Sequence, residues 1–140
     1  MKSRKPTDEE IAQLLSFLPK LTVDGFEPVT RWRGGATTDG ETATFLWPEY
    51  DEVVGEFVRV ASKDCWCDRG YDPSKAGGML ADSNVVRNAG IEQIKTMLTF
   101  CIRGERFCDG HWAGVIKGGE IEMLLRRLAE ITDTPLTPKV

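Results

Sequence analysis

Three stretches of this sequence repeat apolar residues every three or four positions, and this spacing restricts the fold more than any other feature. They are residues 50–61, 91–102 and 121–131. In the first stretch the apolar residues are Tyr50, Val53, Val54, Phe57, Val58 and Ala61. Such a stripe is typical of an amphipathic helix that buries one face. Helices of this length are unstable alone in water, so we expect the three to pack against one another.

Residues 8–18 have the start signal of another helix. Thr7 and Glu10 have the spacing of a capping box, and four apolar residues follow at helical spacing. Pro19 is expected to end this helix, because proline cannot donate the next helical hydrogen bond. A short helix is also predicted over residues 83–87, after an aspartate that is suited to capping it.

Prolines, glycines and one aspartate mark the other expected helix boundaries. Pro48 stands where the first residue of a helix over residues 49–62 is expected. Two glycines at 77–78 are expected to break any helix in their segment. Asp109 is expected to cap a short helix that the glycines at 118–119 end.

Residues 26–47 favour β-structure instead. Residues 26–32 and 42–47 are rich in β-forming side chains, and a loop rich in glycine and threonine separates them. Pro28 weakens the first strand, and a long irregular surface loop is the alternative. The predicted fold is therefore mainly α: a compact bundle of four to five helices with irregular connections and one short β-hairpin.

The size and charge of the chain limit its organisation and its partners. A length of 140 residues suits a single domain over residues 1–140, with its core at about residues 8–132. The formal net charge of −4 argues against nucleic acid as a partner, because such proteins need a basic face. The opposing hypothesis requires five basic residues to share one face: Arg87, Lys95, Lys117, Arg126 and Arg127.

The N-terminal and apolar patterns bear on location. Basic residues at the start are not followed by an apolar stretch, and no apolar run approaches the length of a membrane span. We therefore expect a cytoplasmic protein without a membrane partner. Its four cysteines are then expected to be reduced thiols.

The densest group of polar side chains lies in residues 103–112, which read Arg-Gly-Glu-Arg-Phe-Cys-Asp-Gly-His-Trp. These ten residues include two arginines, two carboxylates, the single histidine, a thiol and two aromatic rings. The segment is too polar for a core element and too aromatic for an ordinary loop. It is therefore the main candidate site, and we expect it at a junction between helices.

This segment resembles an uncharacterised prokaryotic domain family of unknown function. The family has a near-identical run over residues 99–112, and an isoleucine, a glycine and a Leu-Leu-x-Arg-Leu helix follow it, as at Ile116, Gly119 and Leu124–Leu128. The runs Pro-Glu-Tyr-Asp and Asp-Cys-Trp-Cys-Asp-Arg-Gly-Tyr extend the resemblance to about residues 45–132. The family has no assigned activity, so the resemblance implies kinship and no chemistry.

The residues of the segment allow two interpretations. In one, His111 is a general acid or base oriented by Glu105 or Asp109, while Arg103 and Arg106 clamp an anion, as in a small hydrolase or transferase. In the other, arginines and carboxylates form a network that fastens the loop to two helices. No recognised catalytic motif occurs in the sequence, so whether the protein is an enzyme is left open. The favoured function is a small binding or interaction domain for an unidentified small molecule or protein.

A metal site is the minor alternative. Cys65, Cys67, Cys108 and His111 have the right number of ligands for zinc. The Cys-x-Cys spacing of the first pair is not the spacing typical of zinc sites, and Cys101 falls on an apolar stripe. We therefore expect no metal and no cofactor.

Three aromatic residues complete the list of ligand-binding candidates. Trp66, Tyr71 and Trp112 lie beside acidic or basic residues and have the character of side chains that line grooves or interfaces. The alternative for the first two is a loop anchored in the core by its rings.

Overall fold

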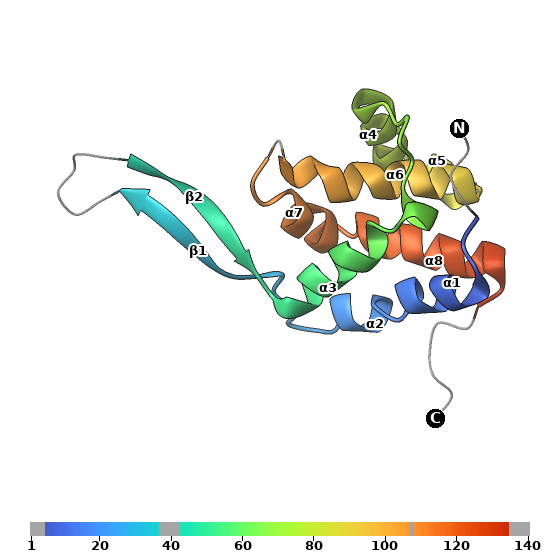
Figure 1. Cartoon of the computed structure of the whole chain (residues 1–140), viewed down its shortest axis with the longest axis horizontal. Helices are drawn as coiled ribbons and strands as arrows, with labels where there is room; N and C mark the ends of the chain where they lie inside the picture. Colours follow the sequence, from blue (N-terminus) through green and yellow to red (C-terminus); the bar gives the residue numbers. More distant parts are fainter. Residues whose placement is uncertain (1–4, 37–42, 107, 135–140) are drawn as a thin grey trace.

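In a computed structural model, the chain forms a bundle of α-helices from which one two-stranded ribbon projects (Figure 1). The structure describes residues 5–36, 43–106 and 108–134. The predicted mainly α fold with one hairpin is confirmed, although the described residues contain more helices than four to five. In chain order the elements are α1 (Asp8–Leu15), α2 (Leu18–Leu21), β1 (Val29–Ala36), β2 (Ala43–Tyr50), α3 (Glu52–Ala61), the 3₁₀ turn η1 (Asp64–Trp66), α4 (Pro73–Ala81), α5 (Ser83–Arg87), α6 (Ile91–Arg103), the 3₁₀ turn η2 (Gly104–Arg106), α7 (His111–Lys117) and α8 (Glu120–Thr132).

The predicted capping box starts α1. The Glu10 N–H donates to Thr7 Oγ1 at 3.2 Å, and the Thr7 N–H donates to Glu10 Oε1 at 2.9 Å. The helix ends at Leu15, before the expected end at residue 18. The expectation that Pro19 ends it is wrong, because Pro19 lies in the first turn of α2, where no helical N–H is needed.

α4 runs through the two glycines that were expected to prevent it. Asp72 caps this helix by accepting from the backbone of Ser74 at 3.0 Å, and Ala76 and Leu80 are buried along one side. A glycine lowers helix propensity by about 1 kcal/mol, which tertiary packing overcomes. Gly77 also gives room to the Phe100 ring, since a Cβ there would lie 3.3 Å from it.

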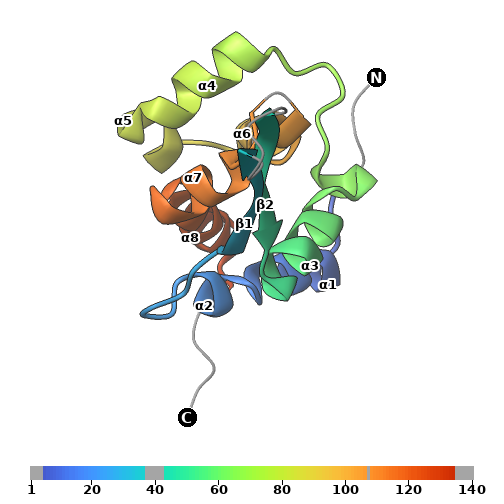
Figure 2. The same ribbon diagram turned by 90° about the vertical axis from the view of Figure 1, so that its left-hand side faces the viewer.

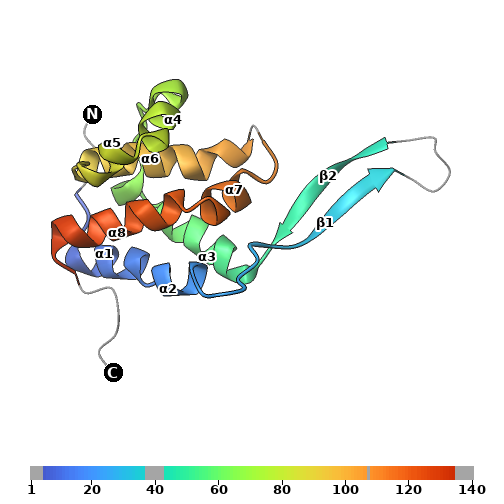
Figure 3. The same ribbon diagram turned by 180° about the vertical axis from the view of Figure 1, so that it is seen from behind.

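The predicted apolar stripes meet in one hydrophobic core. α6 packs against α3, α4, α7 and α8, and Figure 3 shows α8 lying between α6 and α1. The charged side chain of Lys95 is buried beside this core, and its ammonium lies 3.7 Å from Glu92 Oε2. None of the helices in the described part of the chain has both the length and the apolar composition needed to cross a bilayer.

β1 and β2 pair antiparallel and form an arm, here called the β-arm (residues 29–36 and 43–50), which leaves the helical body near α3 and α7. Figure 2 views it from its tip. The strands end three residues later than the predicted hairpin, so Pro48 lies in β2 opposite Trp32 and does not start a helix. Both strands of a two-stranded ribbon are edges, where proline is tolerated. Asp51 caps α3 instead, accepting from the Val53 N–H at 2.9 Å.

Candidate functional site

The polar segment spans the end of α6, the turn η2 and the start of α7, and its side chains divide between two hollows. Arg103, Glu105, Arg106 and Trp112 line a cleft of about 470 Å³ between α3 and α6. We call it the arginine cleft; its other lining residues are Val58, Ala61, Ser62, Cys67, Thr99 and Ile102. The last polar residues of the segment line a separate groove of about 670 Å³ among α4, α6, α7 and α8, and these are Cys108, Asp109 and His111.

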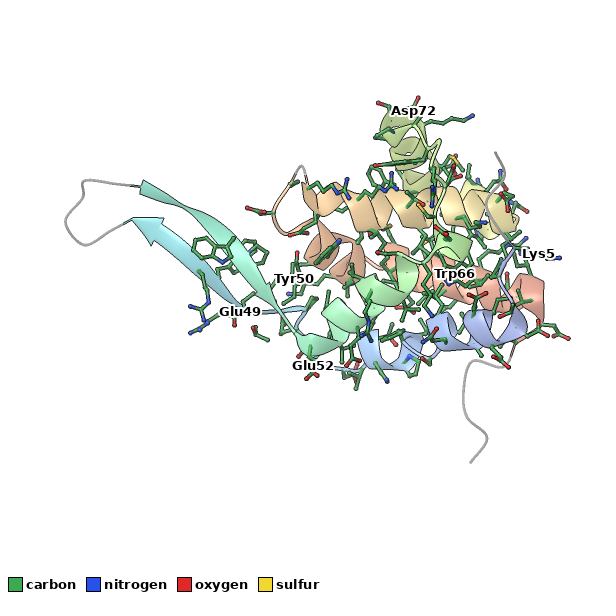
Figure 4. The ribbon with its side chains drawn as sticks, viewed as in Figure 1. Lys5, Glu49, Tyr50, Glu52, Trp66 and Asp72 are labelled. Atoms are coloured by element: carbon green, nitrogen blue, oxygen red, sulfur yellow. The ribbon has the colours of Figure 1, made fainter. Side chains whose placement is uncertain are left out.

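Glu105 fastens the start of α7 and the base of the β-arm. Its Oε1 accepts hydrogen bonds from the Trp112 N–H and the Tyr50 hydroxyl, both at 2.8 Å, and its Oε2 accepts from the Gly110 N–H at 2.9 Å. Figure 4 shows Tyr50 between the arm and the helical body. A carboxylate at this position also interacts favourably with the positive end of the helix dipole.

The expected cap of α7, Asp109, makes no capping bond. The helix begins at His111, and Gly110 precedes it with φ at 92°, a conformation that favours glycine. This turn brings the N–H groups of the first helical turn toward Glu105, which lies earlier in the chain. The prediction that Asp109 caps the helix is wrong, and the cap comes from a carboxylate five residues before Gly110.

The two arginines of the segment do not form the expected network with carboxylates. The Arg103 guanidinium lies 3.2 Å from the Cys67 sulfur, and it stacks over the Tyr71 ring at 5.5 Å from the centroid. Arg106 is exposed and makes no ion pair or hydrogen bond with any residue that the structure describes. Both guanidinium groups line the cleft, and neither forms an ion pair with a described carboxylate.

His111 is packed as part of the scaffold. Its ring meets the Phe100 ring edge to face at 5.2 Å and lies directly over Gly104, where a Cβ would clash with it. Its Nε2 is buried without a hydrogen-bond partner among the described residues. Neither Glu105 nor Asp109 bonds to the imidazole in the described contacts.

The four candidate zinc ligands lie apart. Cys65 is fully buried in the core, Cys67 lines the arginine cleft, and Cys108 and His111 line the other groove. Among the residues that the structure describes, no three histidine, cysteine, aspartate or glutamate side chains are grouped for a metal ion.

Of the aromatic candidates, one lines the cleft, one contacts a residue that lines it, and one is buried in the core. Trp112 lines it, and its indole N–H donates to the Ile102 carbonyl at 2.8 Å. Tyr71 supports Arg103 from outside. Trp66 is 0% exposed and belongs to the core, which agrees with the anchoring alternative.

Four of the five basic residues suggested for nucleic acid are buried or paired with a carboxylate. Lys95 is buried, and Lys117 pairs with Glu27 at 2.8 Å. On α8, Arg126 pairs with Glu122 and Arg127 with Glu130. The fifth residue, Arg87, donates to Asn84 Oδ1 at 2.7 Å.

Tyr50 is the main contributor to the site that the sequence did not reveal. Its position on the apolar stripe placed it in a helix, whereas it is the last residue of β2. Its ring lies 5.0 Å from the ring of Trp112, centroid to centroid. Tyr50 and Glu105 are 55 positions apart in sequence, and no local signal indicates a contact at that separation.

Tyr50 makes the stability of the fold sensitive to alkaline pH. Burial and the hydrogen bond to Glu105 raise the pKa of the Tyr50 phenol above its ordinary value of 10.0. The folded state therefore holds this proton more tightly than the unfolded state does. Its contribution to stability is complete below about pH 10 and is lost as the pH rises through the folded-state pKa.

We expect the urea midpoint of Tyr50→Phe protein to fall less steeply above about pH 10 than that of the wild type. Tyr71→Phe is the matched control, because Tyr71 is the other tyrosine of the sequence. Equal alkaline slopes for wild-type and Tyr50→Phe protein would contradict the assignment.

Comparison with known proteins places the chain in a family. A family model described as a family of unknown function, DUF6508, matches residues 6–134. The chain belongs to DUF6508. The match extends the resemblance noted from residues 45–132 to the N-terminal helices of this DUF6508 protein, so the whole described bundle lies within the family region. No curated protein and no solved structure matches the chain.

Proposed function

We propose that the protein is a non-catalytic binding module, located in the cytoplasm, that takes a small anionic molecule in the arginine cleft. The observation that supports this proposal is the state of the polar groups around the cleft. Nearly all of them are engaged within the protein, and the groups left to meet a ligand are the guanidinium groups of Arg103 and Arg106.

The other side-chain donors that line the cleft already form hydrogen bonds within the protein. The Ser62 hydroxyl donates to the Val58 carbonyl at 2.6 Å, and the Thr99 hydroxyl donates to the Lys95 carbonyl at 2.8 Å. The Trp112 indole N–H is bonded to Ile102. The hydrogen-bond donors of the cleft that can still bind a ligand are therefore those of the two arginines.

The acceptors of the cleft are committed as well. Glu105 lines the cleft, but its carboxylate already accepts three hydrogen bonds. A cationic ligand would have to compete with these bonds. An anionic ligand instead meets charged donors that have no described carboxylate partner, and hydrogen bonds between guanidinium and an anion are among the stronger ones in proteins.

The remaining wall of the cleft is apolar. It consists of Val58, Ala61, Ile102 and the Trp112 ring, and the volume of about 470 Å³ is in the range of small-molecule sites. We therefore expect a ligand with one anionic group and one apolar or planar part. Tyr71 and Cys67 hold Arg103 before a ligand arrives, which lowers the entropic cost of ordering its long side chain.

The test measures the binding of phenyl phosphate by titration calorimetry. Benzyl alcohol is the uncharged comparison. Arg106→Ala is expected to weaken phenyl phosphate binding by about tenfold or more, since it removes a charged donor. Because Arg106 is exposed, this variant should keep its fold.

Arg126→Ala is the matched control, because Arg126 lies on α8 and pairs with Glu122 away from the cleft. The proposal is overturned if wild-type protein does not bind phenyl phosphate, if benzyl alcohol binds equally well, or if the two alanine variants behave alike. Capture of a protein partner without any anion binding would favour the interaction-domain alternative instead.

A further inference from the structure

Two of the residues that line the arginine cleft also hold the β-arm. Glu105 accepts the Tyr50 hydroxyl bond, and Trp112 packs against the Tyr50 ring. We infer that occupancy of the arginine cleft and the position of the β-arm are coupled, so that a ligand in the cleft fixes the arm and the arm in turn sets the affinity of the cleft. This inference rests on the proposed function and assigns it a form of regulation.

The arm meets the helical body through a small set of contacts at its root. Besides the contacts of Tyr50, the Trp32 ring lies against Gly110, where a Cβ would be 3.0 Å from it. The Asp51 N–H donates to the Pro28 carbonyl at 2.8 Å and closes the base of the ribbon. The body side of this root is therefore the segment from η2 to the start of α7, which is also the edge of the cleft.

Beyond its root, few contacts with the helical body hold the described part of the arm. Figure 1 shows the ribbon extending away from the helices, and Trp32 and Trp47 are 49% and 47% exposed. The pairing has irregularities between Val29 and Arg31 and between Arg33 and Gly35. A lone two-stranded ribbon is only marginally stable in water, so a few contacts at the root decide how well the arm is ordered.

The ligand and the arm act on the same side chains. A ligand against the Trp112 ring and beside Glu105 favours the arrangement in which both are held in place. That arrangement is the one in which Tyr50 is docked. A ligand shifts an equilibrium toward the state that binds it better, and such coupling is reciprocal. Loosening the arm must therefore lower the affinity of the cleft for its ligand.

The coupling is tested by hydrogen exchange and calorimetry on the full chain, with phenyl phosphate as the probe. In wild-type protein, phenyl phosphate is expected to slow exchange of the amides of residues 29–36 and 43–50. Tyr50→Phe removes the hydroxyl bond to Glu105. It is expected to speed hydrogen exchange in the arm and to weaken the binding of phenyl phosphate by about fivefold or more.

Thr30→Val is the matched control. It also deletes one hydroxyl hydrogen bond of the arm, from Thr30 Oγ1 to the Glu49 carbonyl at 2.9 Å, but this bond joins the two strands to each other and does not join the arm to the helical body. Its phenyl phosphate affinity should equal that of the wild type. If Tyr50→Phe fails to fold, Trp32→Ser takes its place, because it removes the contact on Gly110 from a half-exposed position.

The outcomes separate this inference from the function on which it rests. If wild-type protein does not bind phenyl phosphate, the proposed function and the coupling are both overturned. If phenyl phosphate binds but leaves arm exchange unchanged, or if Tyr50→Phe and Thr30→Val bind it equally well, the coupling alone is overturned. Slowed arm exchange together with weaker binding in Tyr50→Phe supports it.

Discussion

Replacing Trp66 with alanine is expected to lower the free energy of unfolding by about 3–5 kcal/mol. Trp66 is the largest side chain of the core with no exposed surface. Alanine would leave a cavity that the surrounding helices fill only in part, so the loss combines the transfer energy of the ring with the energy of the cavity. For a domain whose total stability is about 5–15 kcal/mol, this is the largest single loss we predict.

The companion variant is Trp66→Phe. The indole Nε1 is buried without a hydrogen-bond partner among the described residues, so phenylalanine removes an unsatisfied polar group while keeping much of the volume. We expect it to lose less than half of what Trp66→Ala loses. Urea unfolding followed by circular dichroism measures both, and an alanine variant within about 1 kcal/mol of the wild type would contradict the burial of this ring.

The helical bundle was predictable because periodic burial leaves a periodic sequence. The stripes over residues 91–102 and 121–131 correspond closely to α6 and α8, and the capping box at Thr7 and Glu10 marks the start of α1. These signals are local, so they can be recognised without knowing the tertiary contacts between the helices. The stripe over residues 50–61 shows the limit, because its first residue belongs to a strand.

The errors come from contacts between distant parts of the chain. The glycines at 77–78 weaken a helix locally, and packing of α4 against α6 outweighs that effect. Asp109 has the residue type and position of a cap, but the positive φ of Gly110 directs the first turn of α7 to Glu105. The structure therefore assigns the capping role to a residue that the sequence offered as a catalytic partner.

The candidate site was found as a segment and then divided by its geometry. The described residues of the segment 103–112 do lie between α6 and α7, as predicted. Because a helix end, a 3₁₀ turn and a new helix follow one another within ten residues, neighbouring side chains face different hollows. Composition identified the group of charges. It could not show that Arg106 lines the arginine cleft while His111 lines the other groove.

Replacing Glu105 with glutamine is expected to destabilise the fold by about 2–4 kcal/mol, although the two side chains have nearly the same shape. The carboxylate accepts three hydrogen bonds through two oxygens. Glutamine has one oxygen, and with this oxygen toward Tyr50 and Trp112 its NH₂ group faces the Gly110 N–H, donor against donor. An unsatisfied, partly buried donor costs about 1–3 kcal/mol, and the loss of charge beside the start of α7 adds to this.

Glu122→Gln is the matched control, because it makes the same change at a partly exposed residue of α8 that pairs with Arg126. Exposed ion pairs contribute about 0–1 kcal/mol, so this variant should unfold near the wild-type urea midpoint. Equal midpoints for the two glutamine variants would show that Glu105 does not fasten α7. A double-mutant cycle with Tyr50→Phe adds a sharper criterion: since the hydroxyl bond is already weakened in Glu105→Gln, the two losses must sum to more than the loss of the double variant, and strict additivity would mean that Tyr50 and Glu105 do not act together.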